Sequence, residues 1–160
     1  MLRFDDLKAQ LNGEWGGTYL LRLGEPNVPD SVTPSTLSVV TVVHDQFLSL
    51  KYTWSFNDAP HEGLIILGYD KSQRVATAAW IDSWHQSAKI LMCDGVIHDN
   101  GEVDVKGYYG DPPDPQWGWR TTIKATLAGG ALIEMYNCTP EGVEELAVRG
   151  DYSRKGGEVA

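Results

Sequence analysis

The sequence predicts an all-β protein: a single up-and-down antiparallel β-barrel of about ten strands, with one short helix capping an end of it. Two observations carry this prediction. Short segments in which apolar and polar residues alternate follow one another at regular spacing over residues 13–154. Helical spacing of apolar residues occurs only in residues 4–12, before these segments begin. Such a series favours a barrel or a sandwich over an α/β fold.

The helix is predicted from a short amphipathic pattern at the start of the chain. Phe4, Leu7 and Leu11 recur at the spacing of one helix face. Asp5 suits the positive end of a helix dipole, and Gly13 suits the stop that follows the last turn.

The strands are predicted from period-two segments that are rich in β-branched and aromatic residues. Turn-forming pieces with Gly, Pro, Asn and Asp separate them. The two longest connections are rich in proline, and we expect them to be stiff loops at the barrel mouth: residues 24–35 and 110–118. The expected strands are residues 14–22, 35–45, 47–56, 61–70, 74–84, 87–98, 102–109, 117–127, 131–139 and 143–153.

Length and composition are those of one globular domain over residues 1–160, with a tail at 155–160. The net charge is −9, so a nucleic-acid partner, which needs a basic surface, is excluded. No apolar run is long enough to cross a membrane, and the N-terminus lacks the features of a signal peptide. Cys93 and Cys138 have neither CxxC spacing nor a secretory context, so we expect two reduced thiols in a cytoplasmic protein; the alternative is a disulfide.

The two ends of the strand series favour closure into a barrel. If the last strand pairs antiparallel with the first, Arg154 comes beside Trp15. A guanidinium stacked on an indole contributes about 0.5–2 kcal/mol through a cation–π contact. The alternative is that Arg154 is a solvated residue near the chain end.

These residues also carry a resemblance to a known family. The Gly13-Glu14-Trp15 opening resembles that of the lipocalin (calycin) superfamily, in which a basic residue of the closing strand packs on this tryptophan. More narrowly, the chain resembles a mostly bacterial lipocalin-like family without assigned function, domain-of-unknown-function family 1579. It is similar, more distantly, to nitrobindin-type haem barrels and fatty-acid-binding barrels. The matching pieces are GEWGGTY, HEGLIILGYD, AAWIDSW, WGWRT, MYNCTPEG and DYSR.

The resemblance implies a barrel with an internal cavity, but it supplies no catalytic residue, ligand or cofactor. Six tryptophans and seven tyrosines are many for one small domain, and aromatic walls are typical of small-molecule pockets. The alternative is that the rings plug the barrel. The aromatic residues that we predict to line a pocket are Tyr52, Trp54, Trp80, Trp84, Trp117, Trp119 and Tyr136.

The segment WIDSWHQS, residues 80–87, supplies the polar candidates. On an extended strand Asp82 shares one face with its neighbouring tryptophans, and His85 lies on the other face. We expect the face of Asp82 to point inward; the alternative is that Asp82 lies outside the barrel beside a turn. A carboxylate in such a cavity needs a partner, for which Arg120 or a tyrosine hydroxyl would serve. Asp82, Arg120 or His85 would then orient the polar end of a ligand.

No catalytic group is predicted. His61 and Glu62 are adjacent on a strand and face opposite ways, and no nucleophile elbow or phosphate loop is present. The four histidines are scattered, without the spacing of a metal site. We therefore expect a binding protein for a small hydrophobic or aromatic molecule. The alternatives are a haem or metal barrel that uses one histidine, with or without enzymatic activity, and a filled barrel that acts in protein association, including a homodimer.

Overall fold

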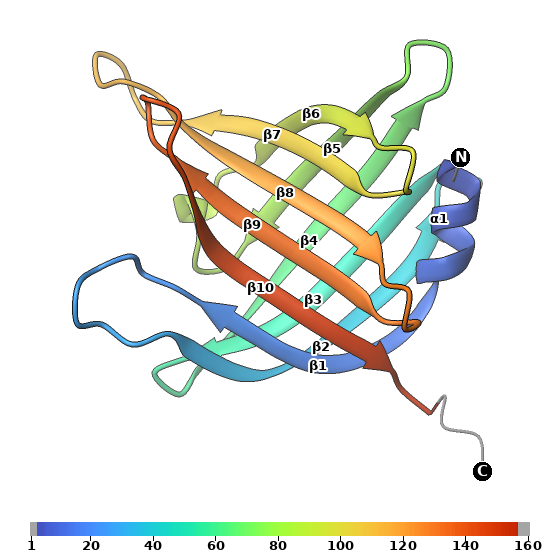
Figure 1. Cartoon of the computed structure of the whole chain (residues 1–160), viewed down its shortest axis with the longest axis horizontal. Coiled ribbons are helices and arrows are strands. Elements are labelled where there is room, and N and C mark those ends of the chain that lie inside the picture. Colours follow the sequence, from blue (N-terminus) through green and yellow to red (C-terminus); the bar gives the residue numbers. More distant parts are fainter. Residues whose placement is uncertain (1–2, 157–160) are drawn as a thin grey trace.

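Ten antiparallel strands close into one barrel in the computed structural model, which describes residues 3–156. Each strand pairs with its neighbour in the chain, and β1 pairs with β10 to complete the ring (Figure 1). The predicted fold class is therefore confirmed. The elements are α1 (Phe4–Leu11), β1 (Gly13–Leu21), β2 (Ser31–Val42), β3 (Phe47–Phe56), β4 (Ala59–Asp70), β5 (Val75–Asp82), the 3₁₀ turn η1 (Gln86–Ala88), β6 (Leu91–Ile97), β7 (Val103–Tyr109), β8 (Trp117–Ala125), β9 (Ala131–Cys138) and β10 (Glu144–Arg154).

Helix α1 covers one end of the barrel, because its apolar face is buried there (Figure 1). Phe4, Leu7 and Leu11 are all buried, as the spacing predicts. At the N-terminal end, the Asp6 carboxylate accepts a hydrogen bond from the backbone N–H of Arg3, which satisfies a donor that the helix leaves free. Of the predicted tail 155–160, residues 157–160 lie outside the described part of the chain.

The seam between β1 and β10 is joined to the end of α1 by two side chains. Trp15 lies opposite Arg154 in the strand register, and the guanidinium carbon is 4.3 Å from the centre of the indole ring. The same guanidinium donates to the backbone carbonyls of Gln10 (2.6 Å) and Asn12 (2.8 Å). The Trp15 indole N–H donates to the carbonyl of Leu11. These bonds satisfy carbonyls that a helix end leaves unpaired.

The close approach of β1 and β10 explains why residue 17 of β1 is a glycine. A Cβ atom on Gly17 would lie 1.9 Å from the backbone oxygen of Asp151 on β10. No side chain fits in that space, so a residue other than glycine would force the two closing strands apart.

Several strand boundaries differ from the prediction, most clearly at the start of β2, at the end of β5 and at the start of β6, which begins at Leu91 and not at residue 87. Strand β2 begins at Ser31, inside the expected loop 24–35, and Pro34 lies opposite Thr18 of β1. The proline content favoured a loop, but pairing with β1 outweighs it. Strand β5 ends at Asp82, two residues before the end of the expected strand 74–84. The chain then turns through η1 before β6.

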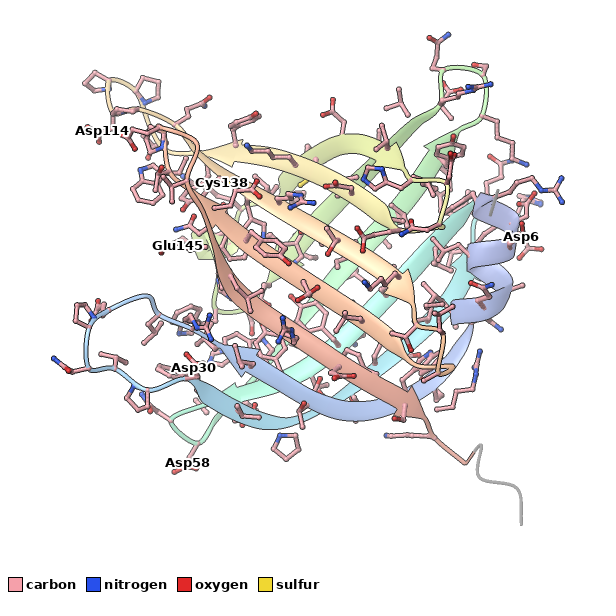
Figure 2. The ribbon with its side chains drawn as sticks, in the orientation of Figure 1. Asp6, Asp30, Asp58, Asp114, Cys138 and Glu145 are labelled. Atoms are coloured by element: carbon pink, nitrogen blue, oxygen red, sulfur yellow. The ribbon has the colours of Figure 1, made fainter. Side chains whose placement is uncertain are left out.

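The barrel end away from α1, which we call the distal end, holds the β1–β2, β3–β4, β5–β6, β7–β8 and β9–β10 connections (Figure 1). Figure 2 shows Asp30, Asp58 and Asp114 on these connections and Asp6 on α1 at the other end. The distal end is therefore rich in carboxylates. Over residues 3–156, no helix has the length and apolar character needed to cross a membrane.

Candidate functional site

A buried carboxylate at the end of β5 organises the distal end of the barrel. Asp82 is only 6% exposed. Its Oδ2 accepts hydrogen bonds from the hydroxyl of Tyr52 (2.6 Å) and the indole N–H of Trp54 (3.3 Å). Its Oδ1 accepts from the backbone N–H groups of Trp84 (2.8 Å) and His85 (3.2 Å). Four donors thus replace the water that this carboxylate loses on burial.

A glycine on β4 makes the bond between Tyr52 and Asp82 possible. Gly63 lies between them in the sheet, opposite Tyr52 of β3 and opposite Asp82 of β5. A Cβ atom on Gly63 would be 2.2 Å from the Tyr52 hydroxyl oxygen, so the tyrosine ring crosses the strand only because no side chain is there. The Tyr52 hydroxyl also accepts a hydrogen bond from the indole N–H of Trp80 (2.9 Å). Burial raises the pKa of Tyr52 well above its usual value.

Four indole rings surround the imidazole of His85. The distances between ring centres are 5.6 Å to Trp54, 5.4 Å to Trp80, 4.8 Å to Trp84 and 5.4 Å to Trp119. The Trp54 ring is nearly parallel to the imidazole, and the Trp84 ring is perpendicular to it. We call these four residues the tryptophan cage. In this structure the cage is filled by a side chain of the same protein.

The prediction that His85 faces away from Asp82 is wrong. It assumed strand alternation through residue 85, but the Asp82 carboxylate binds the next two free N–H groups and turns the chain inward. The three residues that follow have positive φ angles: Gln86 (62°), Ser87 (47°) and Ala88 (65°). Non-glycine residues in this left-handed region cost about 1–2 kcal/mol each. The segment that holds His85 in the cage is therefore a strained one.

His85 is held in its neutral form. Burial lowers its pKa to about 4, and the attraction of the nearby Asp82 carboxylate offsets this only in part. Its Nε2 is buried and has no hydrogen-bond partner among residues 3–156. The same holds for the indole N–H of Trp119 and the hydroxyl of Tyr19. Within residues 3–156, these are the three buried side-chain nitrogen or oxygen atoms without a hydrogen-bond partner.

The rest of the interior is filled by side chains, which differs from the open hollow expected from the sequence. The Tyr19 ring stacks on Trp54 at 4.6 Å and on Tyr52 at 5.8 Å, and Trp80 stacks on Trp119 at 5.1 Å. One gap among these side chains, bounded by Tyr19 and strands β9 and β10, leaves no room for a water molecule. A barrel whose inner rings stack in this way holds a ligand only if one of them moves.

Two residues predicted for the pocket lie outside the barrel. Arg120 donates to the carboxylates of Asp104 (2.8 and 3.0 Å) and Glu144 (3.1 Å), and it lies over the ring of Tyr136. The reason is strand alternation: Trp119 of β8 faces inward, so its neighbour Arg120 faces outward. Arg120 is therefore not the partner of Asp82, and a tyrosine hydroxyl takes that place.

Two further predicted residues lie at the rim of the distal end. Trp117 is the first residue of β8 and is 38% exposed. Trp84 is 39% exposed and forms one wall of the cage. The structure thus brings together Tyr52, Trp54, Trp80, Asp82, Trp84, His85 and Trp119, and separates Trp117, Arg120 and Tyr136 from them.

One pair of side chains at this end was missed by the sequence analysis. The Nδ1 of His61 is 3.0 Å from the hydroxyl oxygen of Ser83. The two residues are 22 positions apart, and only the pairing of β4 with β5 brings them together. In this hairpin Glu62 lies opposite Ser83, which brings the neighbouring His61 close to Ser83. A prediction of the hairpin register from the sequence would have identified the pair. Over residues 3–156, no three His, Cys, Asp or Glu side chains cluster as ligands for a metal.

Comparison with family models places the chain. Residues 7–154 match the model described as "Protein of unknown function (DUF1579)". The chain belongs to this family. The resemblance drawn from the sequence motifs is thereby confirmed for the family itself. A search of curated proteins returned no match.

Proposed function

We propose that this protein binds a small, planar and neutral aromatic molecule in the tryptophan cage, where the ligand ring takes the place of the His85 ring. The observation that carries the proposal is the position of His85. Its imidazole is enclosed by four indoles, yet its Nε2 makes no hydrogen bond within the described chain. A cage that holds one planar heterocycle has the shape and the stacking surfaces for another.

Two features of the His85 segment favour exchange of His85 for a ligand. The left-handed backbone of residues 86–88 costs about 1–2 kcal/mol per residue in the conformation that holds His85 in the cage. Release also returns the His85 imidazole to water, where both of its nitrogens find hydrogen-bond partners. Since Trp84 is already partly exposed, the cage wall nearest to solvent is the one that opens with this segment.

The free polar atoms and the charges indicate the ligand class. The Trp119 indole N–H beside His85 is a donor without a partner, so a ligand that carries an acceptor atom fits it. Asp82 is buried beside the cage and the distal connections carry further carboxylates, so an anionic ligand is repelled (Figure 2). The lowered pKa of His85 indicates that a ring in this place is favoured in its neutral form.

Isothermal titration calorimetry with quinoline at pH 8, where it is neutral, tests the proposal. The His85→Ala variant should bind quinoline at least about 10-fold more tightly than the unaltered protein, because no ring has to leave the cage. Benzoate, an anion of similar shape, should bind neither protein. The matched control is His98→Ala, which removes an exposed histidine on the outside of the barrel. Equal affinity of the His85 and His98 variants for quinoline would refute the proposal.

Two tryptophan variants test the placement of the site. Trp80→Ala and Trp84→Ala each remove a cage wall and should lower the affinity for quinoline by about 10-fold or more, since one stacking partner contributes about 0.5–1.5 kcal/mol beyond its buried area. Near-ultraviolet circular dichroism checks that the fold survives. Trp117→Ala is the control, because Trp117 lies at the rim. If affinity is unchanged in both cage variants, the site is elsewhere.

A second candidate function is self-association through the outer face of β5 and β6. Four apolar side chains are exposed there: Ile81 (40%), Ile90 (66%), Met92 (64%) and Val96 (44%). Clusters of this kind on a soluble protein mark interaction surfaces. Light scattering across a range of concentrations measures the mass in solution, and a dimer that Met92→Glu dissociates would support this candidate.

The remaining alternative, an iron porphyrin or a metal bound through one histidine, fits these residues poorly. His85 lies inside the barrel end, and four indole rings already occupy the space around its imidazole. Within residues 3–156 it has no cluster of further ligand side chains around it. We derive no chemistry through such a group.

A further inference from the structure

Ser83 and His61 form a hydrogen-bonded pair at the rim of the distal end, outside the tryptophan cage. Ser83 follows the last residue of β5 and is exposed, and His61 on β4 is partly buried. The distance between Ser83 Oγ and His61 Nδ1 is 3.0 Å. This separation is within the range at which an imidazole removes a proton from a hydroxyl that attacks a substrate.

Two backbone hydrogen bonds fix the position of Ser83 beside His61. The N–H of Glu62 donates to Ser83 Oγ (3.1 Å), and the N–H of Ser83 donates to the carbonyl of Glu62 (2.9 Å). The tautomer that carries the ring proton on Nε2 accepts the Ser83 proton at Nδ1, and this is the tautomer that the reaction uses.

The imidazole of His61 is itself held in place by a ring contact. It stacks against the Trp54 indole with 4.9 Å between ring centres, at an angle of 35°. Trp54 is buried and donates to Asp82, so it is a rigid support. A base that is oriented by a third group is the arrangement by which proteins activate a serine.

An apolar groove leads to the serine from the outside of the barrel. It has a volume of about 540 Å³ and lies between the ends of β4 and β5 and the segment before β6. Leu64, Ile81 and Ile90 supply its apolar walls, and Ser83 lies in its lining. The two lysines of the lining are paired with carboxylates, Lys51 with Glu62 and Lys89 with Asp111. A groove of this size accommodates a small organic substrate.

We propose that Ser83 and His61 are a nucleophile and general base that hydrolyse carboxylic esters whose apolar acyl chain lies in this groove. Ser83 Oγ bonds to the carbonyl carbon while its proton passes to His61 Nδ1. The ester C–O bond then breaks, and the alcohol leaves with that proton. Water attacks the acyl-serine in the same way, gives one proton to His61, and releases the carboxylic acid as His61 returns the proton to Ser83. No oxidant, metal or further reactant is needed.

Ser83 and the groove lie outside the cage, so the reaction needs no ligand there, but Trp54 of the cage supports His61 and the segment before β6 borders both sites. The test uses the full chain and two reagents. A fluorophosphonate should add to Ser83, as seen by the mass of the intact protein and of its peptides. Hydrolysis of p-nitrophenyl butyrate should be faster than that of the acetate, because the longer chain occupies more of the groove.

Three variants decide the outcome. Ser83→Ala should lose both the fluorophosphonate adduct and the esterase rate, and His61→Gln should lower the rate about 100-fold, as expected for a general base. Ser87→Ala, which removes another exposed serine of the same segment, should retain the adduct and the rate. Circular dichroism verifies that all three are folded. Absence of an adduct on the unaltered protein, or an esterase rate that Ser83→Ala leaves unchanged, would overturn the proposal. Neither result would decide whether quinoline binds in the cage, because calorimetry tests that proposal separately.

Discussion

The hydroxyl of Tyr52 is the atom on which the buried network at the distal end most depends. It donates to the Asp82 carboxylate at 2.6 Å and accepts from the Trp80 indole N–H at 2.9 Å. Tyr52→Phe removes this one oxygen and leaves the ring in place over Gly63. The change therefore tests hydrogen bonding alone, without the cavity that a smaller side chain would create.

The expected cost follows from the two lost bonds. A hydrogen bond to a charged group contributes about 1.5–3 kcal/mol, and a buried donor without a partner costs about 1–3 kcal/mol. Asp82 keeps three other donors, and local adjustment recovers part of the loss, so we expect a decrease of about 3 kcal/mol in the free energy of unfolding. For a chain of this size that corresponds to a melting temperature lower by about 6–12 °C.

Thermal and urea unfolding, both followed by far-ultraviolet circular dichroism, measure the change. Tyr136→Phe is the matched control, since that ring lies on the outside of the barrel beside Arg120. The control should change the unfolding free energy by less than about 0.5 kcal/mol. If Tyr52→Phe is no more destabilising than Tyr136→Phe, the buried network around Asp82 does not exist in the form described.

Three further predictions concern the seam, the cage and a thiol. Arg154→Met removes the contact with Trp15 and two hydrogen bonds to carbonyls at the end of α1. Because Arg154 is exposed, the free energy of unfolding in urea should fall by about 1–2 kcal/mol. An unchanged free energy of unfolding would contradict the role of the seam. The pKa of His85 is about 4 in the folded protein and about 6.5 in the unfolded chain. The part of the unfolding free energy that depends on neutral His85 is therefore fully present above about pH 6.5 and is lost as the pH falls toward 4. His85→Gln should remove about 3 kcal/mol of that acid-induced loss. Burial raises the pKa of Cys93 to about 11, so its reaction with Ellman's reagent at pH 8 should be at least about 10-fold slower in the folded protein than in urea; equal rates would contradict its burial.

Strand patterning made the barrel predictable. Alternation on β3, where Leu48, Leu50, Tyr52 and Trp54 are all buried, depends only on the two-residue repeat of an extended chain. The seam contact was predictable for the same reason, because closure of consecutive antiparallel strands brings the two ends of the series together. Both depend on local geometry and on the order of the strands, which the sequence contains.

The site was predictable only in part. Trp80 and Asp82 lie on β5 and face inward, as alternation requires. His85 follows the end of the strand, and its direction depends on which donors the Asp82 carboxylate accepts. Which residue pairs with that carboxylate depends on the strand register. Tyr52 reaches it across Gly63, whereas Arg120 follows the inward-facing Trp119 on β8 and so lies on the outer face.

By itself, then, the sequence determined the class of fold, the order of the strands and the inner face of each, because these follow from the periodicity of single segments. Only the tertiary structure decided what meets across them: the imidazole within four indoles, the four donors of one carboxylate, and the serine beside a histidine 22 residues away. Such contacts depend on strand register and on the path of short turns. A shift of one residue in either would turn these side chains to the opposite face of the sheet.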